Sequence, residues 1–142
     1  MQFIQLNDGW NAEPNAPDVN IQIQDNNVMV SFYLNAFVFE EFEEDDKGIL
    51  SFHDCIQYRY GSPNDEGFYF FGQSRFKDFD VKWGEFYEVK DSDWKTNFPD
   101  AIKIRNHFDN SKEFKHFLFY FKDGTFECIA SGYNLELLKF TN

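Results

Sequence analysis

The chain has little cysteine and no long hydrophobic run. Of its 142 residues only Cys55 and Cys128 are cysteine, so no disulfide framework is expected. Two reduced, mostly buried thiols are typical of a cytosolic protein. No apolar stretch approaches the roughly 20 residues that span a bilayer, and the first residues lack the basic and apolar regions of a signal peptide. These absences predict a cytoplasmic protein with no membrane partner.

Positive charge is also scarce. Lys and Arg total 13 against 25 Asp and Glu, which gives a net charge of −12. The first 46 residues contain no Lys or Arg and ten acidic residues, so they carry most of this charge. Nucleic acids and anionic membranes bind positive surfaces. The charge therefore excludes them as expected partners and favours a basic protein partner.

Aromatic residues, in contrast, are abundant: 20 Phe, 7 Tyr and 3 Trp make up 21% of the chain. Such a composition is not that of a disordered chain. A chain of this length buries about 70% of its unfolded surface, so its core needs no disulfide or metal. We expect a single domain over residues 1–142, in which residues 1–18 form an irregular N-terminal arm fixed by Trp10.

Alternation of apolar and polar residues, rather than helical periodicity, dominates the chain. Residues 19–24 and 27–34 alternate on either side of a turn signal and predict an antiparallel hairpin. Further strands are expected at 49–60, 68–71 and 79–90, and residues 135–140 are expected to form a final strand or an irregular cover. One short helix is expected near 92–98, because Asp91-Ser92-Asp93 offers capping side chains and Pro99 ends it. The pattern predicts a mainly β fold, an antiparallel β-sandwich or half-open barrel.

The last hairpin has the clearest pattern. Residues 115–122 and 125–131 flank Asp123-Gly124, a type I′ turn signal that pairs Phe119 with Cys128 and Phe121 with Phe126. One face then carries the Phe row and is expected in the core. The opposite face is mixed, and its His116, Tyr120 and Glu127 are predicted to bind a partner.

An acidic run lies at residues 40–46. Its side chains Glu40, Glu41, Glu43, Glu44, Asp45 and Asp46 are predicted to attract a basic protein partner, which could be a toxin domain. The alternative is a solvated loop that only aids solubility. The run lacks the spacing and glycine of a calcium-binding loop.

A second loop, residues 61–67, is bracketed by glycines. Arg59, Asn64, Asp65 and Glu66 are predicted to form one hydrogen-bonded cluster that fixes this loop. An alternative function uses carboxylates for a small hydrolase or lyase. Its candidate residues are Asp54, Asp65, Glu66 and Glu127.

Metal and thiol chemistry have weak support in the sequence. His53 and Cys55 share a strand face, but the hairpin places His116 and Cys128 on opposite faces, so the four cannot converge. Cys128 lies on the Phe face, where a thiol is inert. No phosphate-binding loop occurs. We expect no catalytic residue, no metal and no cofactor.

Three stretches resemble a family of small uncharacterised bacterial proteins. Residues 58–66 match the pattern Y-R-x-G-x-P-N-D-E, residues 88–94 match E-V-x-x-S-x-W, and residues 116–128 match H-F-x-x-x-F-x-D-x-T-F-E-C. The resemblance covers about the last two thirds of the chain and implies no reaction. Small acidic cytosolic proteins of this sort are often encoded beside bacterial toxins as immunity proteins.

The sequence and the resemblance together predict a non-enzymatic, acidic binding protein. Its most concrete form is a cytosolic immunity protein that neutralises a basic bacterial toxin, such as a nuclease. The carboxylate enzyme described above is the alternative, and a structural subunit that binds a host protein is a third possibility. A pocket with converging carboxylates would favour the enzyme, whereas an acidic face would favour the binder.

Overall fold

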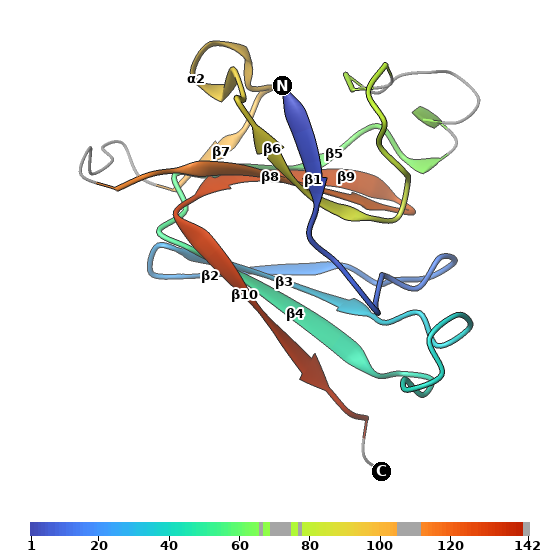
Figure 1. Cartoon of the computed structure of the whole chain (residues 1–142). Helices are drawn as coiled ribbons and strands as arrows, with labels where there is room; N and C mark the ends of the chain where they lie inside the picture. Colours follow the sequence, from blue (N-terminus) through green and yellow to red (C-terminus); the bar gives the residue numbers. More distant parts are fainter. Residues whose placement is uncertain (66, 69–74, 77, 105–111, 141–142) are drawn as a thin grey trace.

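The computed structural model describes residues 1–65, 67–68, 75–76, 78–104 and 112–140. Two antiparallel sheets face each other without closing into a barrel (Figure 1). The larger sheet has the order β1 (Gln2–Gln5), β6 (Phe86–Lys90), β8 (Lys115–Phe121), β9 (Gly124–Ala130), β5 (Gln57–Gly61) and β7 (Ile102–Lys103). The smaller sheet has the order β10 (Gly132–Leu138), β4 (Lys47–His53), β3 (Asn27–Tyr33) and β2 (Asn20–Gln24). The predicted mainly β sandwich is confirmed.

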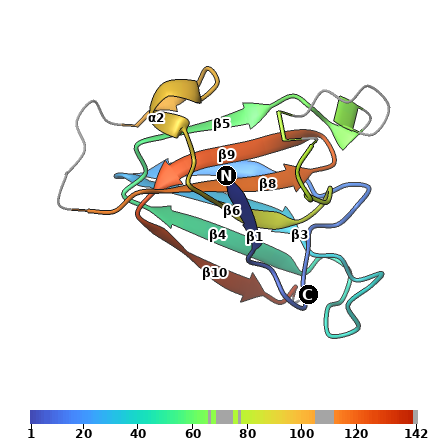
Figure 2. The ribbon, with the colours of Figure 1, turned by 45° about the horizontal axis from the view of Figure 1, so that its top comes forward.

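The short helix α2 (Trp94–Asn97) lies on the face of the larger sheet that points away from the smaller sheet (Figures 1 and 2). Its position within residues 92–98 confirms the predicted helix. The hairpin of β2 and β3 is confirmed as well. Asp25 occupies the left-handed region with φ 57° in the turn between these strands, a conformation that Asp tolerates better than most residues.

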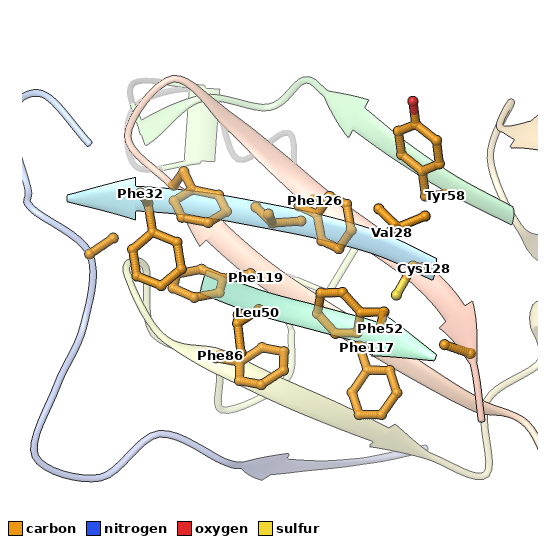
Figure 3. Packing of buried hydrophobic residues seen from close by; sticks show 14 of the residues in the cluster. Val28, Phe32, Leu50, Phe52, Tyr58, Phe86, Phe117, Phe119, Phe126 and Cys128 are labelled. Carbon is orange, nitrogen blue, oxygen red and sulfur yellow. The ribbon is translucent and has the colours of Figure 1, made fainter. Parts of the chain in front are cut away.

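The core fills the space between the sheets. Val28, Val30 and Phe32 of β3 point toward the larger sheet because alternate residues of a strand share a face. They meet the Phe row of β8 and β9, in which Phe119 and Phe126 are almost fully buried (Figure 3). The ring centroids of Phe32 and Phe119 lie 5.4 Å apart. The predicted apolar face of the last hairpin is therefore confirmed as core.

The register of that hairpin was predicted wrongly. Phe119 pairs with Phe126 and Phe121 with Gly124, so the two-residue turn is Lys122-Asp123 rather than Asp123-Gly124. Neither turn residue has the positive φ that a type I′ turn requires. The shift moves each pairing by two residues. Every side chain therefore stays on its predicted face, and hydrophobic alternation cannot distinguish the two registers.

The single strand predicted at 49–60 is also wrong. It is divided into β4 and β5, which belong to different sheets. Asp54, between them, has φ 51° and so redirects the chain. Its carboxylate is half-exposed and pairs with Lys112 at 2.7 Å.

Other predicted strands differ in extent. Within residues 79–90 only β6 is a strand, and residues 79–85 consist of turns, bends and irregular backbone. Phe68 has helical backbone, and the rest of the strand predicted at 68–71 lies outside the described residues. The N-terminal arm was predicted to be irregular, but it contributes β1 to the larger sheet, so that prediction is wrong for Gln2–Gln5. Trp10 is buried as expected. The C-terminal strand begins earlier than predicted, at Gly132.

A second hydrophobic cluster covers the outer face of the larger sheet. Its buried members are Phe76, Tyr87, Val89, Leu118 and Tyr120. Phe3, Phe68, Val81 and Trp83 pack against them from the N-terminal arm and from the segment before β6. The mixed face of the last hairpin is therefore enclosed rather than exposed to solvent.

Candidate functional site

A buried carboxylate occupies the centre of this enclosed face. Glu127 lies in the middle of β9, opposite Leu118 of β8 and Arg59 of β5, and its exposure is 0%. Its Oε2 accepts hydrogen bonds from Arg59 Nη1 at 3.2 Å and Arg75 Nη1 at 2.7 Å. Its Oε1 accepts from Arg75 Nη2 at 3.0 Å and His116 Nε2 at 2.9 Å. Glu127 thus accepts four hydrogen bonds from three residues, two at each oxygen.

These partners decide the charge of Glu127. Burial alone would raise the pKa of its carboxyl, because a low dielectric disfavours the charged form. Hydrogen bonds from His116 and Arg75, and the electrostatic attraction of the same two side chains, outweigh burial. Together they lower the pKa of Glu127 to about 2. Glu127 is therefore an ionised carboxylate at neutral pH and can only accept hydrogen bonds.

The network continues from His116 to Ser92. The distance from His116 Nδ1 to Ser92 Oγ is 2.6 Å, and the exposure of His116 is 2%. Because ionised Glu127 cannot donate, His116 Nε2 carries a proton and donates to it. In the imidazole tautomer with that single proton, Nδ1 accepts a hydrogen bond from the Ser92 hydroxyl. Ser92, His116 and Glu127 therefore form a directed chain of two hydrogen bonds.

A cavity of about 250 Å³ lies beside Glu127. Arg59, Arg75 and Tyr120 line it, together with the hydroxyl-bearing Ser62 and Thr125. Thr125 Oγ1 donates to Pro63 O at 2.8 Å. The cavity thus combines two guanidinium groups with a single carboxylate.

The structure changes the interpretation of three predicted partner-binding residues. His116, Tyr120 and Glu127 are no more than 2% exposed, so they do not form the surface predicted from the mixed face. Alternation showed that they share a face, but not that other segments cover it. Sequence reasoning also missed Arg75, for which no pattern exists, and the role of Ser92, which was assigned only to helix capping.

The loop cluster is only partly assembled. Arg59 Nη2 donates to Ser62 O at 2.6 Å, and its other terminal nitrogen binds Glu127. Asn64 Oδ1 accepts the Gly67 amide at 2.9 Å, and the backbone amide of Asp65 donates to Lys122 O. Within the described residues Arg59 is not hydrogen-bonded to Asn64 or Asp65. Glu66 lies outside the described residues.

The carboxylates of the alternative enzyme have separate partners. Asp54 pairs with Lys112 at 2.7 Å, and Asp65 lies 3.9 Å from Lys122. Glu127 is held by the network described above. Nowhere in the described residues do three or more His, Cys, Asp or Glu side chains gather as they would around a metal ion.

The two thiols lie in the inter-sheet core. Cys55 and Cys128 are free and 0% exposed. Burial, followed by interaction with Cys55, raises the pKa of the Cys128 thiol well above its ordinary value. The predicted buried, reduced pair is confirmed, and a neutral thiol without solvent access is a poor nucleophile.

The acidic run forms most of the connection between β3 and β4 (Figure 1, cyan). Five of its six predicted side chains are exposed: Glu40, Glu41, Glu43, Glu44 and Asp45. We name residues 35–46 of this connection the acidic loop. The N-terminal arm lies beside it, because a Cβ on Gly9 would be 3.9 Å from Glu41 Oε1.

Asp46 differs from the other acids of the run. It is 1% exposed, so it is not the surface residue that was predicted. Its carboxylate accepts the backbone amides of Glu43 at 2.9 Å and Phe140 at 2.8 Å, and Lys139 Nζ at 3.0 Å. These bonds, the two backbone amides first, lower the pKa of Asp46. Asp46 therefore ties the acidic loop to the C-terminal segment.

The acidic loop also exposes apolar side chains. Phe37 is 77% and Val38 66% exposed, the two highest values among the large hydrophobic residues described as exposed. Phe37 lies on the rim of a groove of about 510 Å³, with Tyr33, Leu34 and Ala36. The acidic members of the rim are Glu13, Glu44 and Asp45. An apolar groove with a carboxylate rim is complementary to a partner that carries apolar and basic side chains together.

The comparisons with known proteins add no assignment to this geometry. In the described ranges of the chain, no helix has the length and apolar character needed to cross a membrane. No family model, no curated protein and no solved structure matches this chain.

Proposed function

We propose that this chain is an acidic binding protein whose acidic loop captures a basic protein partner. In its most concrete form it is a cytoplasmic immunity protein that neutralises a basic bacterial toxin. The observation that carries the proposal is the acidic loop, which presents five exposed carboxylates next to the exposed Phe37 and Val38.

Charge supports this role through the rate of encounter. Carboxylates concentrated at one end of a molecule attract a basic partner over distances near the Debye length, about 8 Å at physiological salt. Such steering raises association rates and falls steeply with ionic strength. Because the loop concentrates exposed carboxylates, it also resembles the polyanionic surface that a nuclease recognises.

Apolar side chains support the role through affinity. Interfaces derive most of their binding energy from a few buried aromatic or arginine side chains, surrounded by a polar rim. Phe37 fits the aromatic anchor, and the adjacent groove accepts an apolar side chain of the partner. The Asp46 hydrogen bonds hold the loop in place before binding, so less ordering entropy is lost.

The test screens purified basic toxin domains, nuclease domains among them, and measures association with any domain that binds. The loop variant replaces Glu40, Glu41, Glu43 and Glu44 by Gln, and Phe37→Ala is made separately. We expect the loop variant to lower the association rate at low salt and Phe37→Ala to raise the dissociation rate. Co-expression of the wild type should restore growth of cells that produce the toxin.

A control variant removes the same charge elsewhere. It replaces the exposed Asp25, Asp91, Asp93 and Asp100 by Asn, so both variants carry −8 instead of −12. The control should associate nearly as fast as the wild type. Equal rates for all three proteins at every salt concentration, or no binding of the toxin, would contradict the proposal.

A further inference from the structure

We propose that Ser92 is an activated nucleophile and that Ser92, His116 and Glu127 form a hydrolytic site for short acyl esters. The site is separate from the acidic loop and independent of the proposed binding role. It is carried by the two hydrogen bonds of 2.6 Å and 2.9 Å that connect the three side chains.

The backbone places Ser92 where a nucleophile is useful. β6 ends at Lys90, Asp91 follows with φ 55°, and α2 begins at Trp94. Ser92 thus lies in a sharp turn from a strand to a helix, where a side chain projects from the sheet edge. Because Val89 of β6 pairs with His116 of β8, the turn that follows β6 lies close to His116 and brings Ser92 Oγ to its ring.

The network gives each side chain a distinct role. Glu127 is ionised and buried, so it fixes the His116 tautomer with the proton on Nε2. Nδ1 can then act as general base toward Ser92, which is the logic of a serine–histidine–carboxylate triad with the ring nitrogens exchanged. The Trp94 amide donates to Ser92 Oγ at 3.2 Å and so helps to fix the position of the hydroxyl beside His116.

Space for a substrate exists on the solvent side of Ser92. A hollow of about 150 Å³ is lined by both Ser92 and His116 and accepts a short acyl group. A wider groove of about 430 Å³ continues from Ser92 along Trp94 and Phe114. The two aromatic side chains favour an aryl leaving group. Ser92 itself is half-buried, so its hydroxyl can be reached without opening the core.

The proposed reaction has two steps. Ser92 Oγ attacks the ester carbonyl carbon, its proton passes to His116 Nδ1, and the carbonyl π pair moves to the oxygen. Collapse breaks the bond to the leaving oxygen, which takes the proton from His116 and departs as the alcohol or phenol. Water then attacks the acyl-serine, giving its proton to Nδ1, and the acid leaves as Ser92 regains a proton.

The first experiment uses a fluorophosphonate probe on the folded, full-length chain. We expect one adduct, located at Ser92 by peptide mass spectrometry, and none at this position in heat-denatured protein. Ser92→Ala should lose the adduct. Ser131→Ala is the matched control, because it removes a half-buried hydroxyl bonded to His53 O and should keep the labelling of Ser92 unchanged.

The second experiment follows release of p-nitrophenol from p-nitrophenyl acetate. The wild type and Ser131→Ala should accumulate acetyl-Ser92, whereas Ser92→Ala should not. Ser92→Cys keeps a nucleophile and should be acetylated at position 92, which protects the test if the alanine variant misfolds. Glu127 is a positioning residue. Glu127→Gln should therefore lower the rate at which p-nitrophenyl acetate acetylates Ser92.

Labelling of the wild type at other serines but not at Ser92 would overturn the proposal. Equal rates of p-nitrophenol release by Ser92→Ala and by the wild type would also overturn it. Neither result affects the binding proposal, which is tested at the acidic loop by association rates. The two proposals can therefore fail separately.

Discussion

At the scale of single residues, Glu127 shows how a charge can be buried in a chain so rich in Phe. An isolated carboxylate in this position would be expelled or protonated, because burial removes its hydration. Two arginines and a histidine replace the water, and each of its oxygens has two donors. Removing such a charge leaves its cationic partners unpaired, so we expect the whole network to depend on it.

This dependence has a definite sign with pH. The pKa of Glu127 is about 2 in the folded chain and near 4.5 when unfolded, so its charge contributes stability that is present above about pH 5 and lost as pH falls toward 2. The contribution is about 3 kcal/mol. Glu127→Gln should lower the free energy of unfolding at pH 7, and the difference from the wild type should shrink at pH 3.

Urea unfolding at several pH values measures this effect. The control is Glu136→Gln, because Glu136 is exposed on β10 and its loss should change the free energy of unfolding by less than about 0.5 kcal/mol. A Glu127→Gln protein that is as stable as the wild type at pH 7 would contradict the role assigned to the network.

Individual residues also show the limits of sequence reasoning. The burial of Phe119 followed from alternation, since a continuous apolar face must be covered. The pairing of Glu127 with Arg75 could not be predicted, because 52 residues separate them and no periodicity relates their segments. Asp46 stood in a run of acids and looked like its neighbours. Its burial depends on Lys139 and Phe140, at the other end of the chain.

At the scale of elements, the last hairpin illustrates the difference between face and register. Gly124 was read as a turn residue, but it lies in β9 with Gly61 beside it. A Cβ on Gly124 would come within 2.9 Å of the backbone oxygen of Gly61 and 3.2 Å of the Tyr60 ring. The glycine is therefore needed for the close approach of β5, and no turn geometry requires it.

Replacement of this glycine tests the register. Gly124→Ala should lower the free energy of unfolding by about 1–3 kcal/mol, because the backbone of β5 must shift to admit the methyl group. Gly132→Ala is the matched control, since nothing lies within 4 Å of its added Cβ. That variant should be neutral or slightly more stable, because alanine restricts the unfolded chain. Equal effects of the two substitutions in urea unfolding would contradict the observed pairing.

The acidic loop is an element held by one side chain. Asp46→Asn removes the charge that accepts from two backbone amides and Lys139, so it should lower the free energy of unfolding by about 1–3 kcal/mol. Hydrogen exchange should speed up within the loop, at the Glu43 amide above all. Asp45→Asn is the control, because Asp45 is exposed and Asn tolerates its φ of 73°. Unchanged exchange at Glu43 in Asp46→Asn would argue against this anchor.

At the scale of the whole molecule, a sandwich was predictable and its outer cover was not. Two-residue alternation defines which face of a strand is apolar, and two such faces pack together. The outer face of the larger sheet is covered by segments with little regular structure, including Phe76, Trp83 and Phe98. Irregular segments carry no periodic signal. From the sequence, His116 and Glu127 were therefore predicted to lie on a partner-binding surface. Their enclosed network was not predicted.

The distribution of charge gives a last prediction for the molecule as a whole. Exposed carboxylates crowded in the acidic loop repel one another, and self-repulsion destabilises a compact state. Replacing Glu40, Glu41, Glu43 and Glu44 by Gln should therefore keep or raise the melting temperature at low salt, by the equivalent of at most about 1 kcal/mol. Any gain should vanish at high salt, where screening removes the repulsion. Thermal unfolding at both salt concentrations measures it. A lower melting temperature would mean that these carboxylates stabilise the fold, whereas an equal or higher one would mean that stability is not the reason to keep them.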